Sequence, residues 1–298
     1  MRNIFEKFFL LSFLLVNRTL KLSSASILPT RVLELERRSS INARVLLCVY
    51  FMMSLGPVVV AEEKWQEHRS SHFVIYFKEA PLDFIQTVEE NAERYYEEIT
   101  LNLGFTRYES WTWDQRAKIY IYNDQEDYVA SSRQIQWSHG AAAVKEKTIR
   151  TFPSAHGFFD STLPHELGHI IFREFVGFQA DIPLWFEEGV AMYQEKAKRW
   201  GAQKVVQRAM AENKFISLPD LGRLRLNNNT PAERVDLFYA EAASVVYYLI
   251  TEFNKSRFVS FCQELKEGQD FNNSLQAVYN RFKDVREFND AWVKYLQK

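Results

Sequence analysis

The chain has 298 residues, of which 47% are hydrophobic and 15% aromatic, enough to bury a core in one large domain or two small ones. Its formal net charge of -1 gives no sign of the basic surface that nucleic-acid binding requires. Residues 1–61, however, hold eight Lys/Arg against three Asp/Glu, so positive charge is concentrated at the N-terminus. Such an excess is typical of export signals.

An apolar run in this N-terminal region has the pattern of a signal peptide. Three arginines precede residues 45–53, Gly56-Pro57 follows, and Val59 and Ala61 provide short side chains before two glutamates. We expect cleavage after Ala61, which makes residues 1–61 an N-terminal extension and signal peptide. A membrane anchor is the alternative, but the run at 45–61 has only 17 residues and is broken by Gly-Pro. Because a signal this far into a chain is unusual, we expect translation to begin downstream of Met1.

The mature protein is therefore expected to comprise residues 62–298 and to be exported, either periplasmic or secreted, and membrane-anchored only if the signal is retained. The chain has two cysteines, Cys48 and Cys262. If Cys48 is removed with the signal, no disulfide can form within the chain, a situation more typical of bacterial than of animal exported proteins.

Residues 62–155 combine strands with helix. Alternating β-branched and aromatic residues predict strands, some near a sheet edge, at Ser71–Phe77, Lys118–Tyr122, Ala141–Val144 and Thr148–Phe152. Apolar residues at helical spacing predict helices at Pro81–Leu103, which Gly104 ends, and at Gln125–Ser132.

Residues 156–298 are predicted to be almost entirely helical. The expected helices are Ser161–Val176, Pro183–Arg199, Ala202–Glu212, Pro231–Phe253, Lys255–Glu267, Asn273–Arg281 and Val285–Gln297. The predicted fold class is α+β, with a small mixed sheet in the N-terminal part, an edge strand over the cleft and a mainly helical C-terminal part.

The helix expected at Ser161–Val176 carries the sequence His165-Glu166-Leu167-Gly168-His169. Ser161 is its expected N-cap, and Pro164 is tolerated in the first turn. The two histidines stand one turn apart on one face, so both imidazoles can reach one Zn²⁺. Glu166 lies beside the metal, where a carboxylate can take a proton from an activated water.

Such a catalytic zinc site needs a third protein ligand and leaves the fourth position to water. Eighteen residues separate His169 from Glu188, which belongs to the segment Trp185-Phe186-Glu187-Glu188-Gly189-Val190-Ala191. A turn at residues 177–183 allows the next helix to return antiparallel and to present Glu188 to the same metal. Glu187 is the rival for this position, but the spacing favours Glu188. The other histidines, His68, His72, His139 and His156, have no ligand spacing.

These motifs resemble those of the gluzincin metallopeptidases, especially the peptidase MA-like branch. The resemblance implies that His165, His169 and Glu188 hold one Zn²⁺ per chain and that Glu166 is the general base and then the acid. Gluzincins also use a downstream Tyr or His to stabilise the oxyanion, and Tyr239 is the candidate, with a role as a core tyrosine as its alternative. A metzincin is excluded, because its third histidine would fall at Phe175.

The resemblance also bears on the kind of cleavage. Gluzincin aminopeptidases carry a Gly-x-Met-x-Asn loop upstream of the zinc helix, and the corresponding residues 139–146 lack it. This absence favours an endopeptidase, with an edge strand at Ala141–Val144 or Thr148–Phe152 that pairs with an extended peptide.

We therefore expect a zinc-dependent peptidase that acts on a peptide or protein substrate. The alternative is an inactive zinc-containing module that binds the cell envelope or a protein partner; hydrolysis of a non-peptide amide or ester is also left open. An intact Glu166 argues against the inactive module, since a purely structural zinc site needs no base and is normally closed by four protein ligands.

Overall fold

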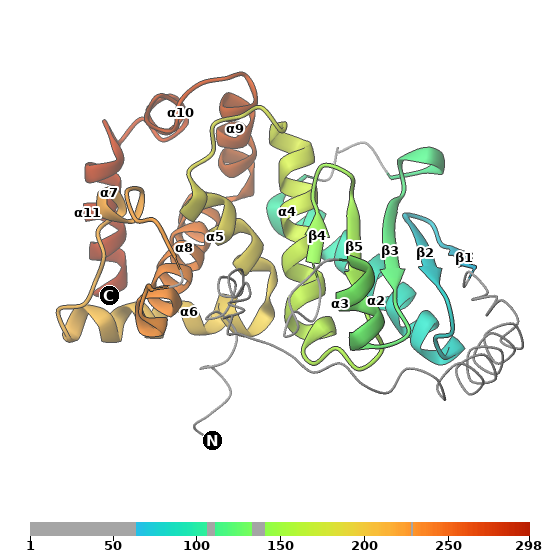
Figure 1. Ribbon diagram of the computed structural model, residues 1–298. Helices are drawn as coiled ribbons and strands as arrows, with labels where there is room; N and C mark the ends of the chain where they lie inside the picture. The colour runs from blue at the N-terminus through green and yellow to red at the C-terminus, as the bar shows by residue number, and fades with distance from the viewer. Residues whose placement is uncertain (1–63, 106–110, 133–140, 228) are drawn as a thin grey trace, which may run out of the picture. The chain divides into compact units, whose positions relative to one another are not determined.

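A five-stranded mixed sheet forms the N-terminal part of the fold in the computed structural model (Figure 1). The structure describes residues 64–105, 111–132, 141–227 and 229–298, so the expected signal peptide, Cys48 and His139 lie outside the described residues. Residues 65–298 belong to one compact unit. No helix among the described residues is long and apolar enough to cross a membrane.

The strand order is β1-β2-β3-β5-β4. The strands are β1 (Gln66–Arg69), β2 (Phe73–Phe77), β3 (Ala117–Ile121), β4 (Ala141–Ala143) and β5 (Thr148–Thr151). The central strands β2, β3 and β5 run parallel, and the outer strands β1 and β4 are antiparallel to their neighbours. The central strands are largely buried, which explains their content of Ile, Val and Phe.

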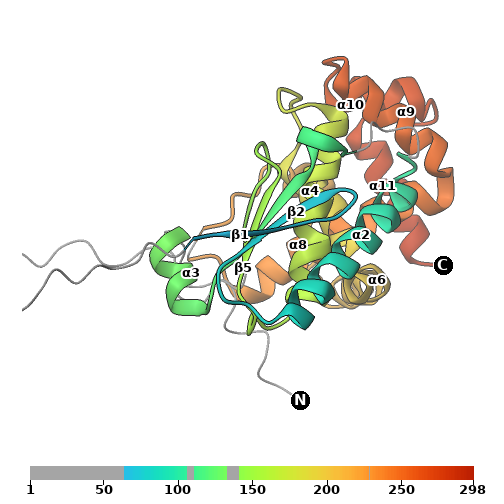
Figure 2. The ribbon, with the colours of Figure 1, turned by 90° about the vertical axis from the view of Figure 1, so that its right-hand side faces the viewer.

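Helices lie on both sides of this sheet. Figure 2 shows α3 (Gln125–Ser132) on one side and α2 (Leu82–Leu103) with α4 (Leu163–Val176) on the other. Helix α2 buries one apolar stripe against the core and ends at Gly104, whose φ of 79° gives a left-handed C-cap. A single cluster of buried side chains runs from the sheet through α2 and α4 into the helical part.

The C-terminal part is helical, as expected. Besides α4, its helices are α5 (Leu184–Gln194), α6 (Lys196–Ala211), α7 (Leu218–Leu221), α8 (Ala232–Phe253), α9 (Lys255–Lys266), α10 (Phe271–Val278) and α11 (Val285–Leu296). Helix α8 is the central element: most of its side chains are buried, and it packs against α5, α6, α9 and α11. The predicted α+β class, with the sheet first and the helices after it, is confirmed.

Two details of the prediction were wrong. The helix expected at Pro183–Arg199 is broken at Glu195, where ψ is 108°, so that α5 ends and α6 begins there. Ser161 is not an N-cap, because it lies in η2 (Phe158–Thr162), a π-helical turn that continues directly into α4. Of the two segments considered as an edge strand, Ala141–Val144 is the one at the edge, since β5 lies between β3 and β4, and β4 is the outermost described strand on that side.

Short elements without strong periodicity were not predicted from the sequence. These are β1, α7, η2 and η1 (Trp113–Gln115). Each has five residues or fewer, too short for an apolar repeat to show.

Candidate metal centre

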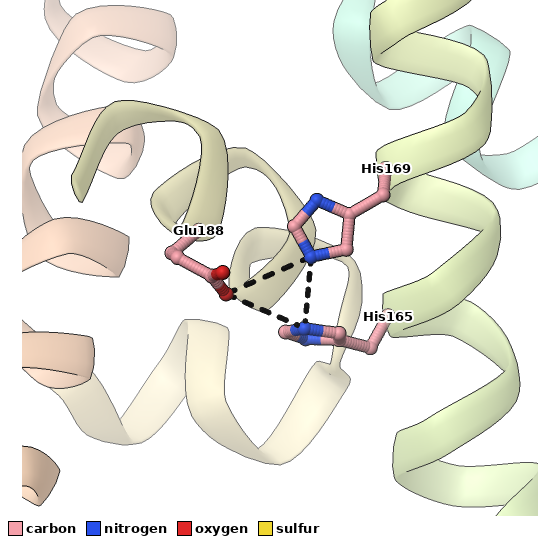
Figure 3. A group of neighbouring side chains, drawn as sticks. All are labelled: His165, His169 and Glu188. Atoms are coloured by element: carbon pink, nitrogen blue, oxygen red, sulfur yellow. Dashed lines mark hydrogen bonds and ion pairs between the residues drawn. The ribbon is translucent and has the colours of Figure 1, made fainter. Parts of the chain in front are cut away.

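Helix α4 presents His165 and His169 on one face, one turn apart, as their spacing predicts (Figure 3). The opposite face is buried through Leu163, Leu167 and Ile171, which fixes the rotation of the helix about its axis. Because the apolar face of α4 is held in the core, the opposite face with the two imidazoles points toward α5.

The neighbouring helix α5 brings Glu188 to the same point. The Nε2 atoms of His165 and His169 lie 3.1 Å apart, and Glu188 Oε2 lies 3.6 Å from each of them. The equidistant point in the plane of the three atoms is about 2.0 Å from each, and an ion displaced from that plane into tetrahedral geometry would be about 2.1 Å from each, within the ~2.0–2.2 Å of zinc bonds to imidazole and carboxylate. The donor set and its spacing therefore fit a tetrahedral zinc ion that keeps one position for another ligand.

A carboxylate behind His165 fixes the orientation of its ring. Glu195 Oε1 accepts a hydrogen bond from His165 Nδ1 at 3.0 Å, and Ser161 Oγ donates to the other carboxylate oxygen of Glu195. The side chain of Glu195 is only 5% exposed. With Nδ1 protonated toward Glu195, the lone pair of His165 lies on Nε2, the atom that faces His169 and Glu188.

Glu187, the rival for the third ligand position, has a different role in the structure. Both of its carboxylate oxygens accept hydrogen bonds from the guanidinium of Arg173, which also donates to the carbonyl of Ala180. Glu187 Oε1 lies 3.8 Å from His169 Nδ1, on the side of the ring away from Glu188. Glu187 therefore lies on the Nδ1 side of His169 beyond hydrogen-bond distance and is held by Arg173, so the geometry favours Glu188 as the ligand.

The carboxylates around the two imidazoles favour positive charge. Burial alone lowers the pKa of His165, but hydrogen bonds to Glu188 and Glu195 outweigh it and raise the pKa to about 10. Burial raises the pKa of Glu188, but the hydrogen bonds with His165 and His169 lower it to about 2. A pocket with this charge balance stabilises a cation between the three side chains, whether a proton or a metal ion.

Tyr239 lies on α8, near the same group of carboxylates. Burial and then the negative charges of Glu188, Glu166 and Glu195 raise its pKa well above the usual value of a phenol. The side chain therefore keeps its proton at neutral pH and remains a hydrogen-bond donor. Glu166 is half-buried, and its charge acts on both His165 and Tyr239, which indicates that its carboxylate lies in their neighbourhood.

Two glycines allow the three helices to approach closely enough to form this centre. A Cβ at Gly168 on α4 would lie 3.0 Å from Gln194 Cγ and 3.1 Å from Ala191 Cα on α5. A Cβ at Gly189 on α5 would lie 2.4 Å from the carbonyl oxygen of Ala242 on α8. Gly168, next to His169, and Gly189, next to Glu188, thus allow the short distances from α4 to α5 and from α5 to α8.

Among the described residues, His165, His169 and Glu188 are the only group of three or more His, Cys, Asp or Glu side chains whose spacing suits a metal ion. His68 and His72 instead pair with Glu89 and Glu93 of α2, each at 2.6 Å. Cys262 is a buried free thiol.

An α+β fold in which a His-Glu-x-x-His helix faces a glutamate on the next helix defines a metallopeptidase-like protein. The family model described as the Peptidase MA superfamily matches residues 110–298, more than half of the chain, and the chain belongs to that family. The match includes α4, α5 and α8 but begins after β1, β2 and α2. The chain is thus a peptidase, and so a hydrolase, at the superfamily level, and members of this superfamily are typically zinc-dependent. No curated protein matches the chain.

Proposed function

We propose that this protein is a zinc-dependent endopeptidase of the gluzincin type, with His165, His169 and Glu188 as the ligands of one zinc ion. The observation that carries the proposal is the near-equilateral arrangement of their three donor atoms, 3.1 to 3.6 Å apart, with Glu166 beside them. A zinc ion held there would polarise the substrate carbonyl and lower the pKa of a water molecule.

The side chains around the ligands divide the remaining chemistry between them. Glu166 takes a proton from the attacking water onto its carboxylate and then delivers that proton to the amine that leaves. Tyr239 donates its phenolic hydrogen to the oxygen that becomes negative when the carbonyl is attacked. A tyrosine with a raised pKa suits this role, because it does not ionise before the substrate arrives.

Strand β4 is the proposed binding site for the peptide backbone. Among the described strands it pairs only with β5, and it is the strand on the side of the sheet that faces the helical part (Figure 1). An extended peptide that pairs with this edge needs no free terminus, which supports internal cleavage of peptides or proteins.

Replacement of Glu166 by Gln tests this function. The variant is expected to cleave casein at least about 100-fold more slowly, because the general base is lost, while zinc remains near one per chain. Glu212 is exposed and directly follows the last residue of α6. Glu212→Gln is therefore the control and should retain full activity. Equal activity of Glu166→Gln and the control would exclude the role of Glu166.

The alternative function is an inactive zinc-containing module. It predicts bound zinc but no chelator-sensitive products when a peptide library is digested. The presence of Glu166 next to the ligand His165, outside the group of three possible ligands, argues against this alternative, since a structural site has no use for a further carboxylate beside the metal and is normally closed by four protein ligands.

We also propose that the protein is exported and that the mature chain begins at Glu62. The charged and apolar pattern of residues 37–61 supports this proposal. N-terminal sequencing of the protein recovered from outside the cytoplasm should give Glu-Glu-Lys-Trp; a retained N-terminus in the membrane fraction would instead identify the segment as an anchor.

A further inference from the structure

Helix α6 has a basic outer face. The helix contains five Lys/Arg and no Asp or Glu. Its fully buried side chains are those of Ala202, Val206 and Ala209. At 100° per residue, the opposite side spans an arc of about 120° that contains Lys196, Trp200, Lys204 and Arg208. These four residues are called the α6 face below.

An exposed indole lies within this face. Trp200 is 69% exposed, although its ring contacts that of Tyr247 edge-on at 6.3 Å. Val205, which lies between this face and the buried side of the helix, is 44% exposed. Tryptophan buries more apolar area than any other side chain when it finds a partner, so an indole left in water is a candidate for contact with another surface.

The cations of the α6 face are available to a partner. Neither Lys204 nor Arg208 forms an ion pair with any residue that the structure describes, and Lys196 has only a 3.4 Å contact with Glu98. Glu212, which directly follows the helix, is paired with Lys214 at 2.9 Å, and Arg208 acts on it only through its charge. Among the described residues, two of the three cations of the face, Lys204 and Arg208, therefore have no ion-pair partner, and they flank the indole of Trp200 on the same side of the helix.

We propose that the α6 face docks on the surface of an anionic lipid bilayer. Indole rings are favoured at the depth of the lipid headgroups, and Lys and Arg beside them bind lipid phosphates. The helix runs along the lower margin of the helical part in Figure 1 and is seen nearly end-on in Figure 2. An acidic protein partner would also match the positive charge of the α6 face. It is less favoured, because an indole surrounded by cations on a single helix is the pattern expected at the lipid headgroups.

The helix that carries the α6 face is connected directly to the metal centre along the chain. Helix α6 begins directly after Glu195, whose carboxylate contacts His165. The docking itself does not depend on catalysis, and variants of the α6 face should retain full activity on soluble casein.

Sedimentation with lipid vesicles tests the proposal. Residues 62–298, the proposed mature chain, are suitable, because residues 65–298 belong to one compact unit with a buried core and the apolar run at 45–61 is then absent. The protein is expected to bind vesicles of phosphatidylcholine with about one third phosphatidylglycerol, and to bind pure phosphatidylcholine much more weakly. Trp200→Ala and the double variant Lys204→Glu/Arg208→Glu should each bind the anionic vesicles at least about tenfold more weakly.

Matched controls come from other parts of the surface. Trp113, which is 82% exposed in η1, controls for loss of an indole as Trp113→Ala. Lys283→Glu/Arg286→Glu near the start of α11 controls for the change in net charge. Both controls should bind as the unsubstituted protein does, and casein cleavage by every variant verifies that it is folded.

Equal vesicle binding by the α6-face variants and the controls would overturn the proposal. It would also be overturned if the unsubstituted protein bound polyglutamate but not the anionic vesicles, since that outcome identifies an acidic polypeptide as the partner.

Discussion

Replacement of Gly189 by Ala should move two helices of the metal centre apart. The added Cβ would lie 2.4 Å from the oxygen and 2.8 Å from the carbon of the Ala242 carbonyl, and 3.0 Å from Val246 Cγ2. Two of these atoms belong to the backbone of α8, so no side-chain rotation relieves the overlap. Ordinary contact requires a displacement of about 1 Å between α5 and α8.

The cost of this displacement can be compared with that of a neutral glycine replacement. Overpacking in a core costs about 1–3 kcal/mol or more, and the better helix propensity of Ala returns about 1 kcal/mol. Gly201 on α6 has nothing within 4 Å of the same added atom, so Gly201→Ala should stabilise the protein by up to about 1 kcal/mol. The two variants should therefore differ by roughly 1–3 kcal/mol in the free energy of unfolding.

Urea denaturation of both variants measures this difference. Because Glu188 precedes Gly189 and Tyr239 lies on α8, a shift of about 1 Å should also lower casein cleavage by up to about 100-fold in Gly189→Ala. If Gly189→Ala were as stable and as active as Gly201→Ala, the close packing of α5 on α8 would not be what positions the site.

Two further variants test the electrostatics of the structure. Glu195→Gln should weaken zinc binding about 10- to 100-fold, measured in competition with a chelator, because Glu195 holds the ring of His165. The control Glu174→Gln, at the other end of α4, should leave the zinc affinity unchanged. Equal zinc affinities of the two variants would contradict the role of Glu195. Glu241 is fully buried, and among the described residues only the backbone N–H of Ile216 donates a hydrogen bond to its carboxylate. This burial raises the pKa of Glu241 to about 8. As the pH rises above about 4.5, Glu241 loses its proton in the unfolded chain but keeps it in the folded protein. The free energy of unfolding should therefore fall by a few kcal/mol between about pH 4.5 and 8 and change no further above pH 8. Glu241→Gln should flatten this dependence in urea titrations at several pH values, and an unchanged slope would show that Glu241 is ionised in the folded state.

The sequence was sufficient to predict the parts of the site that depend on local periodicity. The spacing of His165 and His169 places both on one face of any α-helix, so their proximity required no tertiary information. To predict the position of Glu188, it was enough to expect a turn after the first helix and an antiparallel helix that follows it. The roles of these residues as zinc ligands stay predictions.

The groups behind the ligands could not be predicted, because they depend on a break in the chain and on contacts between distant elements. The segment around Glu195 continues the helical pattern without Gly or Pro, so nothing in it signals the break between α5 and α6. The partner of Glu195 is Ser161, 34 residues earlier, which the pattern predicts as a cap. The pairing of Glu187 with Arg173 likewise appears only when α4 and α5 are packed together.

The zinc content of two isosteric variants tests the central claim most directly. Native mass spectrometry of the purified protein should show one zinc ion per chain in the unsubstituted protein and in Glu187→Gln, whose carboxylate lies behind His169. Glu188→Gln should lose zinc during purification, since it lacks the third ligand. Retention of zinc by Glu188→Gln together with its loss from Glu187→Gln would contradict the assignment of the metal centre.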